Sequence, residues 1–191
     1  MSLDEQQRAV LLGIARRSID TGIDGGHPTA LPDGDYAEAL MKPRGNFVTL
    51  RSGPELRGCC GSVWPKRLLA EDVWRNAYAS GWHDPRFPVL SRKDVAGIGI
   101  EISVLSEPER LAATAEEQLL QVLRPGTDGL LLETDDRRVT YLPAVWQQLP
   151  AAVDFLLHLK RKAGWQDDYW SSSIRCYRYE VESFAASAVS S

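Results

Sequence analysis

The segment with the clearest capacity for chemistry carries two adjacent thiols, Cys59 and Cys60, between Gly58 and Gly61. Arg57 precedes them, and an arginine close to a thiol favours the thiolate, the nucleophilic and metal-binding form of cysteine. Glycine inside a strand costs stability and typically marks a bulge or the close approach of a ligand or another backbone. We interpret this segment as a candidate reactive site centred on Cys59.

Only one of the two thiols can serve a given site, because side chains alternate between the faces of a strand. We expect Cys60 to pack in apolar surroundings as a small hydrophobe. The third cysteine is Cys176, and three cysteines with two adjacent argue for reduced thiols rather than a secreted disulfide framework. Zinc-ligand spacing and a nucleotide-binding glycine loop are both missing from the sequence, so we predict no metal and no cofactor.

Length and charge limit the function classes. The 191 residues suit one domain, which buries roughly 70% of its unfolded surface without needing a disulfide or metal. The formal net charge of -4 argues against nucleic acid or an anionic membrane as partner. The N-terminus shows no signal-peptide pattern, and no apolar run is long enough to span a bilayer. We therefore predict a cytoplasmic protein.

Charge is uneven along the sequence. Residues 42–93 hold ten basic and four acidic side chains, a balance of +6, whereas residues 94–136 hold ten acidic and two basic ones, a balance of -8. Such asymmetry marks either a ligand surface or segments that the fold interleaves, so that the charges cancel.

The elements that must position these residues are a hairpin, a helix and a central strand. Residues 47–50 and 56–63 are expected to form the hairpin around Ser52-Gly53-Pro54, and a helix over residues 68–80 is expected to end near Gly81. Two prolines make residues 84–88 a rigid loop. Alternating isoleucines predict a strand over residues 98–104 with one buried face.

Other elements complete the expected fold. We predict the following: a first helix over residues 3–19; a short helix over 36–41; a helix from 114 to 123 opened by a Thr114–Glu117 capping box; a second hairpin of residues 129–134 and 137–142; helices over 143–149 and 154–163; and a last strand over 174–184. Hairpins outnumber βαβ units, which indicates an α+β fold with a largely antiparallel sheet flanked by helices.

Several ordered blocks resemble one known family. Leu56-Arg57-Gly58-Cys59-Cys60-Gly61 is similar to the Leu-Arg-Gly-Cys-Ile-Gly motif of the AMMECR domain family, called AmmeMemoRadiSam system protein A in many prokaryotes. Further matching blocks follow in family order: Asp84-Pro85-Arg86-Phe87, Glu101–Ser106, Leu142-Pro143 with Val145-Trp146, Phe155-Leu156, Leu159-Lys160 to Gly164, Tyr177-Arg178-Tyr179 and Glu182-Ser183-Phe184. The departure is Cys60, where the family usually has isoleucine.

The resemblance implies an α+β fold with a larger and a smaller lobe. We expect this single domain to comprise residues 1–184 and residues 185–191 to form a flexible tail. The resemblance also implies two protein partners, a Memo-like protein and a radical-SAM protein. It implies no particular reaction.

Five residues of the matching blocks have complementary chemistry, and we expect them to converge on one cleft. Cys59 would be a nucleophile or redox thiol, Arg57 and Arg86 would hold an anion, and Glu101 would move a proton or orient an arginine, with Asp84 beside them. The alternatives are structural: a buried thiol at Cys59, and ion pairs of the arginines with Asp84 or Glu101.

The flanking Gly58 and Gly61 would let a ligand approach the backbone. His83, next to the Asp84 block, could act as a base for Cys59 if the fold brings them together.

Two function classes fit these residues. The first is a cysteine-centred enzyme, or enzyme component, acting on a small anionic metabolite. The second is a non-catalytic binding or accessory module for the Memo-like and radical-SAM partners. The reactivity of Cys59 separates them, because catalysis needs a reactive thiolate.

Overall fold

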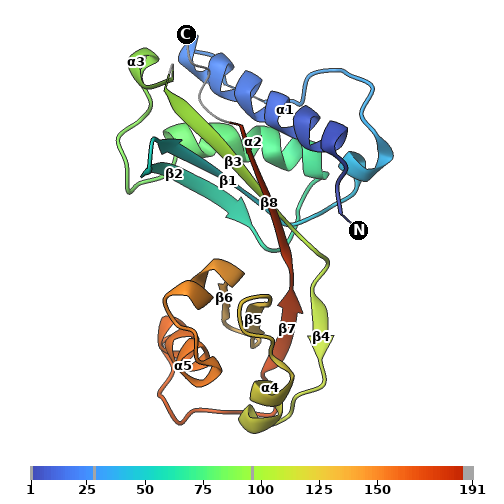
Figure 1. Cartoon of the computed structure of the whole chain (residues 1–191), viewed down its shortest axis with the longest axis vertical. Helices are drawn as coiled ribbons and strands as arrows, with labels where there is room; N and C mark the ends of the chain where they lie inside the picture. The colour runs from blue at the N-terminus through green and yellow to red at the C-terminus, as the bar shows by residue number, and fades with distance from the viewer. Residues whose placement is uncertain (1, 28, 96, 187–191) are drawn as a thin grey trace. The chain divides into compact units, whose positions relative to one another are not determined.

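The chain is folded as two compact α+β units. The computed structural model describes residues 2–27, 29–95 and 97–186. One unit comprises Met1–Leu105 with Glu182–Ser191, and the other comprises Ser106–Val181. Each is built on its own four-stranded antiparallel sheet, with strand orders β2-β1-β3-β8 and β4-β7-β5-β6 (Figure 1). The predicted α+β class, with a larger and a smaller lobe, is confirmed.

The sheet of the larger unit contains the predicted hairpin and central strand. Its strands are β1 (Asn46–Ser52), β2 (Glu55–Ser62), β3 (Ile98–Leu105) and β8 (Val181–Ala186). The turn between β1 and β2 places Gly53 at a φ of 56°, which glycine adopts readily. On β3, Ile98, Ile100, Ile102 and Val104 are at most 2% exposed, so the alternation predicted from the sequence is confirmed.

Both long helices of this unit pack on the apolar face of its sheet (Figure 1). Helix α1 (Glu5–Ile23) begins with an Asp4–Gln7 capping box, and α2 (Leu69–Trp82) runs through Gly81, where we had expected it to end. The short helices are η1 (Glu38–Met41) and α3 (Arg92–Val95). None of the helices in the described part of the chain combines the length and apolar character needed to cross a membrane.

The smaller unit packs its helices on a second apolar core. Its elements are β4 (Glu109–Leu111), α4 (Glu116–Val122), β5 (Gly129–Glu133), β6 (Arg138–Tyr141), η2 (Pro143–Gln147), α5 (Ala152–Lys162) and β7 (Arg175–Tyr179). Leu119, Leu132 and Leu159 are fully buried, and Trp146 stacks on Phe155 with ring centroids 3.7 Å apart.

Three details of the prediction need correction. The single strand predicted over residues 174–184 is two strands, β7 and β8, separated at Glu180 and belonging to different sheets. Strand β8 extends to Ala186, two residues into the predicted tail; residues 187–191 lie outside the described residues. The Thr114–Glu117 capping box is absent because α4 starts after Ala115, and Thr114 donates to Gln118 instead.

Candidate functional site

The Cys59 thiol lies on the face of the sheet opposite the two helices. Strand β2 is an edge strand, and Thr49 of β1 is the register partner of both Cys59 on β2 and Glu101 on β3. Side chains of directly paired residues share one face of a sheet. Cys59 is half-buried, and the hydroxyl of Thr49 donates to its sulfur over 3.4 Å. The thiol is therefore held in place but is still accessible.

The Asp84 carboxylate clamps the backbone of Cys59 to the rigid loop. It accepts the Cys59 N–H at 2.9 Å and the Arg86 N–H at 3.2 Å, and the Arg86 guanidinium donates to it through Nε at 2.9 Å and Nη2 at 2.7 Å. The hydrogen bond from the Arg86 side chain, assisted by the two backbone N–H groups, lowers the pKa of Asp84 against the opposing effect of burial. This carboxylate is saturated by donors of its own chain.

Arg86 remains open to solvent although its partner is buried. Its side chain is 57% exposed, whereas that of Asp84 is 4% exposed. Nη2 of Arg86 also lies 3.5 Å from the carbonyl oxygen of Cys59. The guanidinium is thus fixed by Asp84 at the edge of β2, immediately beside the backbone of the thiol.

The Ser80 hydroxyl of helix α2 joins the helix to the hairpin. It accepts the N–H of Cys60 at 2.9 Å and lies 2.7 Å from the carbonyl oxygen of Val48, to which it donates. A Cβ at Gly58 would lie 1.8 Å from the carbonyl oxygen of Ser80. The glycine at position 58 is therefore required by the close approach of α2, and Gly58 is buried beneath it.

The neighbouring motif residues also have structural explanations. Cys60 pairs with Val48 on the helix-facing side of the hairpin, where it is half-buried, and burial raises the pKa of its thiol. A Cβ at Gly61 would lie 2.1 Å from the carbonyl oxygen of Asn46. Like Cys60, Cys59 and Cys176 are free thiols, as we predicted.

The structure brings together three of the five residues expected to converge. Cys59, Asp84 and Arg86 meet, whereas Arg57 pairs with Asp94 of α3 at 3.7 Å and Glu101 pairs with Arg51 at 3.5 Å. Glu101 shares the sheet face of Cys59 but lies two strands away, roughly 10 Å between backbones at the usual strand spacing. The ion-pair partner of Glu101 is Arg51. The alternative considered from the sequence, an ion pair of Glu101 with Arg57 or Arg86, is therefore wrong.

Sequence reasoning missed Thr49, Ser80 and Arg51. Thr49 and Arg51 became visible only once the register of three strands was known, because pairing partners cannot be read from one strand. His83 is exposed and packs edge-on against Tyr78, with ring centroids 5.2 Å apart. We find no contact that would make it a base for Cys59 among the described residues.

The match to a family model extends over nearly all of these elements. The AMMECR1 family model matches residues 12–184, which include the Cys59 hairpin, the Asp84 loop and strand β3. The chain belongs to the AMMECR1 family. Relatives include a protein of Methanothermobacter thermautotrophicus, 32% identical over 188 residues that cover 95% of each chain. Protein MJ0810 of Methanocaldococcus jannaschii is 34% identical over 153 residues, 78% of this chain and 76% of that protein.

A solved structure supports the fold of this AMMECR1-family chain. Protein PH0010 from Pyrococcus horikoshii superposes with a TM-score of 0.83 at 29% identity, covering 96% of this chain and 93% of PH0010. The arrangement of strands and helices is therefore shared with an experimentally observed member of the fold.

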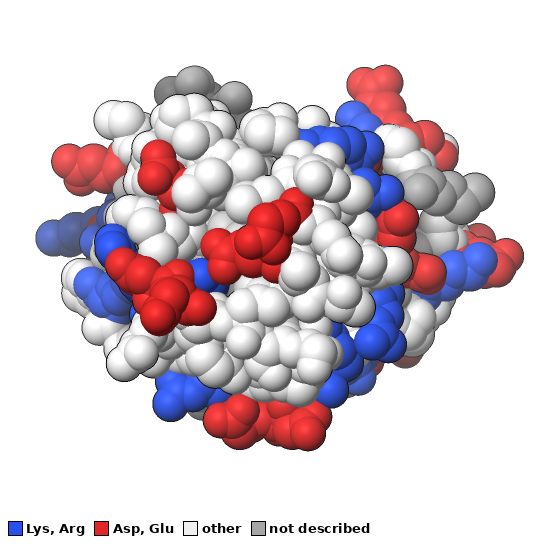
Figure 2. All heavy atoms as spheres, turned by 90° about the horizontal axis from the view of Figure 1, so that it is seen from below, with Lys and Arg blue, Asp and Glu red and all other residues white. Residues whose placement is uncertain are grey.

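Charges and metal ligands in the AMMECR1-family chain do not indicate a second reactive centre. The basic segment pairs with the acidic one through Arg51–Glu101 and Arg57–Asp94, and Figure 2 shows acidic and basic side chains interspersed on the face that it presents. Within residues 2–27, 29–95 and 97–186, no group of three or more His, Cys, Asp or Glu side chains is arranged to hold a metal ion.

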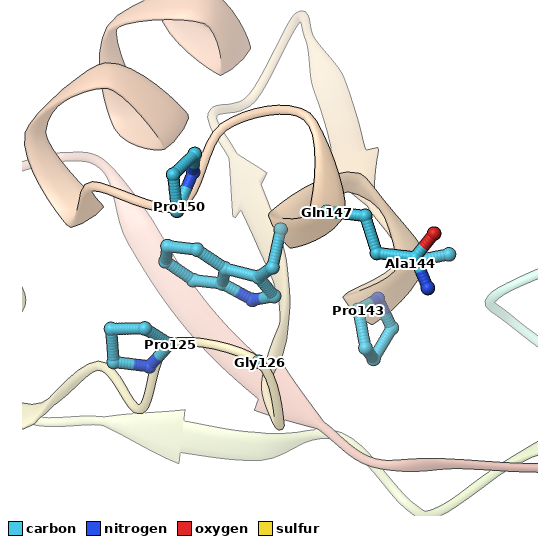
Figure 3. A pocket seen from close by; sticks show the side chains of 7 residues that line it. Pro125, Gly126, Pro143, Ala144, Gln147 and Pro150 are labelled. Atoms are coloured by element: carbon cyan, nitrogen blue, oxygen red, sulfur yellow. The ribbon is translucent and has the colours of Figure 1, made fainter.

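The smaller unit has an uncharged hollow of its own. It measures about 410 Å³ and is bordered by the rings of Pro125, Pro143 and Pro150 (Figure 3), with Gly126, Ala144, Trp146 and Gln147 completing the lining. The indole N–H of Trp146 is already donated to the carbonyl oxygen of Asp128 at 2.7 Å. None of the described lining residues carries a nucleophilic or ionisable side chain.

Proposed function

We propose that Cys59 and Arg86 form the working site of this AMMECR1-family chain. In this proposal the Arg86 guanidinium holds a small carboxylate or phosphate against the Cys59 thiol, in a cysteine-centred enzyme or enzyme component. The observation that carries the proposal is an exposed guanidinium, fixed by the buried Asp84, that lies directly beside the backbone of the half-buried Cys59.

The free donors of Arg86 support anion binding. Asp84 accepts from Nε and Nη2, while Nη1 has no hydrogen-bond partner among the described residues. Arginine presents its donors in a planar fork that matches carboxylate and phosphate oxygens. Arg57, two residues before Cys59 on β2, adds a second guanidinium whose contact to Asp94 is long, at 3.7 Å.

A second function is favoured by the surroundings of the sulfur. The one hydrogen-bond partner of the Cys59 sulfur within the described residues is the Thr49 hydroxyl, which donates and is not a base. This favours a non-catalytic binding or accessory module, which would hold its ligand at the same place. The AmmeMemoRadiSam resemblance then supplies a Memo-like protein and a radical-SAM protein as proposed partners.

Alkylation protection tests the anion site. Phosphate or acetate bound to Arg86 should slow the reaction of iodoacetamide with Cys59 more than with Cys60, which faces the other side of the hairpin. Arg86→Ala should remove this protection, whereas Arg92→Ala, which deletes a 76% exposed arginine of the same unit, should keep it. Labelling of each cysteine is read by peptide mass spectrometry. Equal rates with and without both anions would contradict the proposal.

Cys59→Ser separates the two functions. The hydroxyl keeps the shape of the thiol but loses most of its nucleophilicity. Loss of activity in a reconstituted system with the partner proteins, with Cys60→Ser as the matched control, would support catalysis. Retained activity in Cys59→Ser, together with anion binding that depends on Arg86, would favour the binding module.

A further inference from the structure

A second cavity lies on the open face of the larger unit's sheet and takes no part in the contacts of Cys59 and Arg86. It measures about 200 Å³. Its charged lining residues are Arg51 and Glu101, and the rest of the lining is small or apolar: Gly53, Gly97, Gly99, Ile100, Ala185 and Ala186. The cavity therefore pairs two opposite charges with a wall that has little side-chain bulk.

One glycine of this cavity, Gly99, is not required by the fold. Gly99 lacks a positive φ, so any residue can adopt its backbone conformation. A Cβ at Gly99 would meet the carbonyl oxygens of Arg51 and Ala186 at 3.7 and 3.8 Å, which is ordinary contact. At Gly97 a Cβ would meet no described atom within 4 Å. Glycine inside a strand costs about 0.5–1 kcal/mol of stability relative to alanine. No close contact requires glycine at position 99, and the missing side chain leaves space in the cavity.

The two charged groups have unused hydrogen-bonding atoms. Arg51 donates through Nε to Oε2 of Glu101 at 3.5 Å and through Nη1 to the carbonyl oxygen of Pro54 at 3.4 Å. Nη2 of Arg51 and Oε1 of Glu101 have no partner among the described residues. The side chains are 44% and 35% exposed, and a single long contact between exposed charges stabilises little, so a ligand can compete for both groups.

We propose that this cavity binds a small zwitterion, a free α-amino acid. Its carboxylate would accept from Arg51 and its ammonium group would donate to Glu101. The two protein charges are adjacent, and the two charges of an α-amino acid are likewise separated by a single carbon. The open space above Gly97 and Gly99 takes the side chain. This site does not depend on the proposed function of Cys59 and Arg86.

The test is a titration of the full chain with L-alanine, followed by the backbone amide NMR signals of Gly97 and Gly99. Propionate and ethylamine, which each carry one of the two charges, are the matched controls. We expect saturable shifts with L-alanine and at least tenfold weaker binding of either control. Arg51→Gln and Glu101→Gln should each weaken L-alanine binding at least tenfold.

Variants at Gly99 locate the site. Gly99→Val fills the cavity with a residue that strands favour and should abolish the L-alanine shifts. Gly99→Ala, whose Cβ makes only ordinary contacts, is a second variant with a smaller loss. Arg86→Ala should bind L-alanine as wild type does, which separates this result from the test of Cys59. Absence of saturable binding, equal affinity for propionate, or unchanged binding in both Gly99 variants would overturn the proposal.

Discussion

Replacing Asp84 with asparagine tests whether the clamp on Cys59 holds the candidate site together. Four donors converge on this carboxylate: the Cys59 N–H and three groups of Arg86. Asparagine keeps one acceptor oxygen. In place of the second oxygen it has an NH₂ group, which faces the donors whose hydrogen bonds that oxygen accepts in the wild type. The variant therefore loses two hydrogen bonds to a charged acceptor and leaves a donor facing donors.

The size of the effect follows from burial. Hydrogen bonds to a charged group contribute about 1.5–3 kcal/mol each, so two of them set an upper limit of roughly 3–6 kcal/mol. The Arg86 side chain is 57% exposed, so water can replace some of the hydrogen bonds that its guanidinium loses. We therefore expect Asp84→Asn to lower the free energy of unfolding by about 2–3 kcal/mol. For a chain of this length that corresponds to a fall in melting temperature of roughly 4–12 °C.

The pH dependence gives an independent check of the same reasoning. The pKa of Asp84 is lowered in the folded protein, so its charge stabilises the fold fully above the unfolded pKa of about 3.9. This stabilisation is lost as the pH falls through the folded-state pKa. The difference in unfolding free energy between wild type and Asp84→Asn should be constant above about pH 5 and should narrow below about pH 4.

Urea denaturation followed by circular dichroism at several pH values measures this difference. Asp35→Asn is the matched control, since Asp35 is an exposed aspartate of the same unit, and it should change stability by less than about 0.5 kcal/mol. The reasoning would be refuted if Asp84→Asn were as stable as Asp35→Asn at pH 7. A difference that stays constant down to pH 2 would refute the role of the carboxylate charge.

Two further predictions use the same denaturation and labelling assays. Gly58→Ala should destabilise the chain by about 1–3 kcal/mol or more, because its Cβ would lie 1.8 Å from a backbone oxygen. Gly13→Ala, at an exposed position of α1 where a Cβ would meet no atom within 4 Å, should stabilise the chain by up to about 1 kcal/mol. Equal effects would rule out the clash. Iodoacetamide at neutral pH should label Cys59 before Cys60, and Cys176 last, because burial raises the pKa of Cys176 to about 11; early labelling of Cys176 would contradict its burial.

The sequence predicted elements whose signal is local. The alternation over Ile98–Val104 and the hairpin around Gly53 were both correct, because side-chain period and turn chemistry act within a few residues. The split between β7 and β8 at Glu180 could not be predicted, because aromatic and β-branched residues continue across it and the change of sheet depends on distant pairing partners.

Only the part of the candidate site that has a local signal in the sequence could be predicted. Cys59, Asp84 and Arg86 were chosen from motif blocks, and the structure places them in contact. The partners of Arg57 and Glu101 depend on α3 and on the register of β1 with β3, neither of which has a local signature in the sequence. Helix α3 is only four residues long, which is too short for a periodic pattern to be detected.

The glycines near the two proposed sites are of two kinds: those at which a Cβ would clash with the backbone, and those at which it would not. Gly58 and Gly61 are explained by contacts of 1.8 and 2.1 Å that a Cβ would make, so their place in the Cys59 motif needs no ligand. A Cβ at Gly97 or Gly99 would meet no such obstacle, and both glycines line the cavity beside the weakly paired charges of Arg51 and Glu101. Substituting the first pair would disturb the fold and report little about chemistry. The motif's function must therefore be tested at the Cys59 side chain itself, whereas the proposed zwitterion site can be tested by adding atoms at Gly99 without disturbing the backbone.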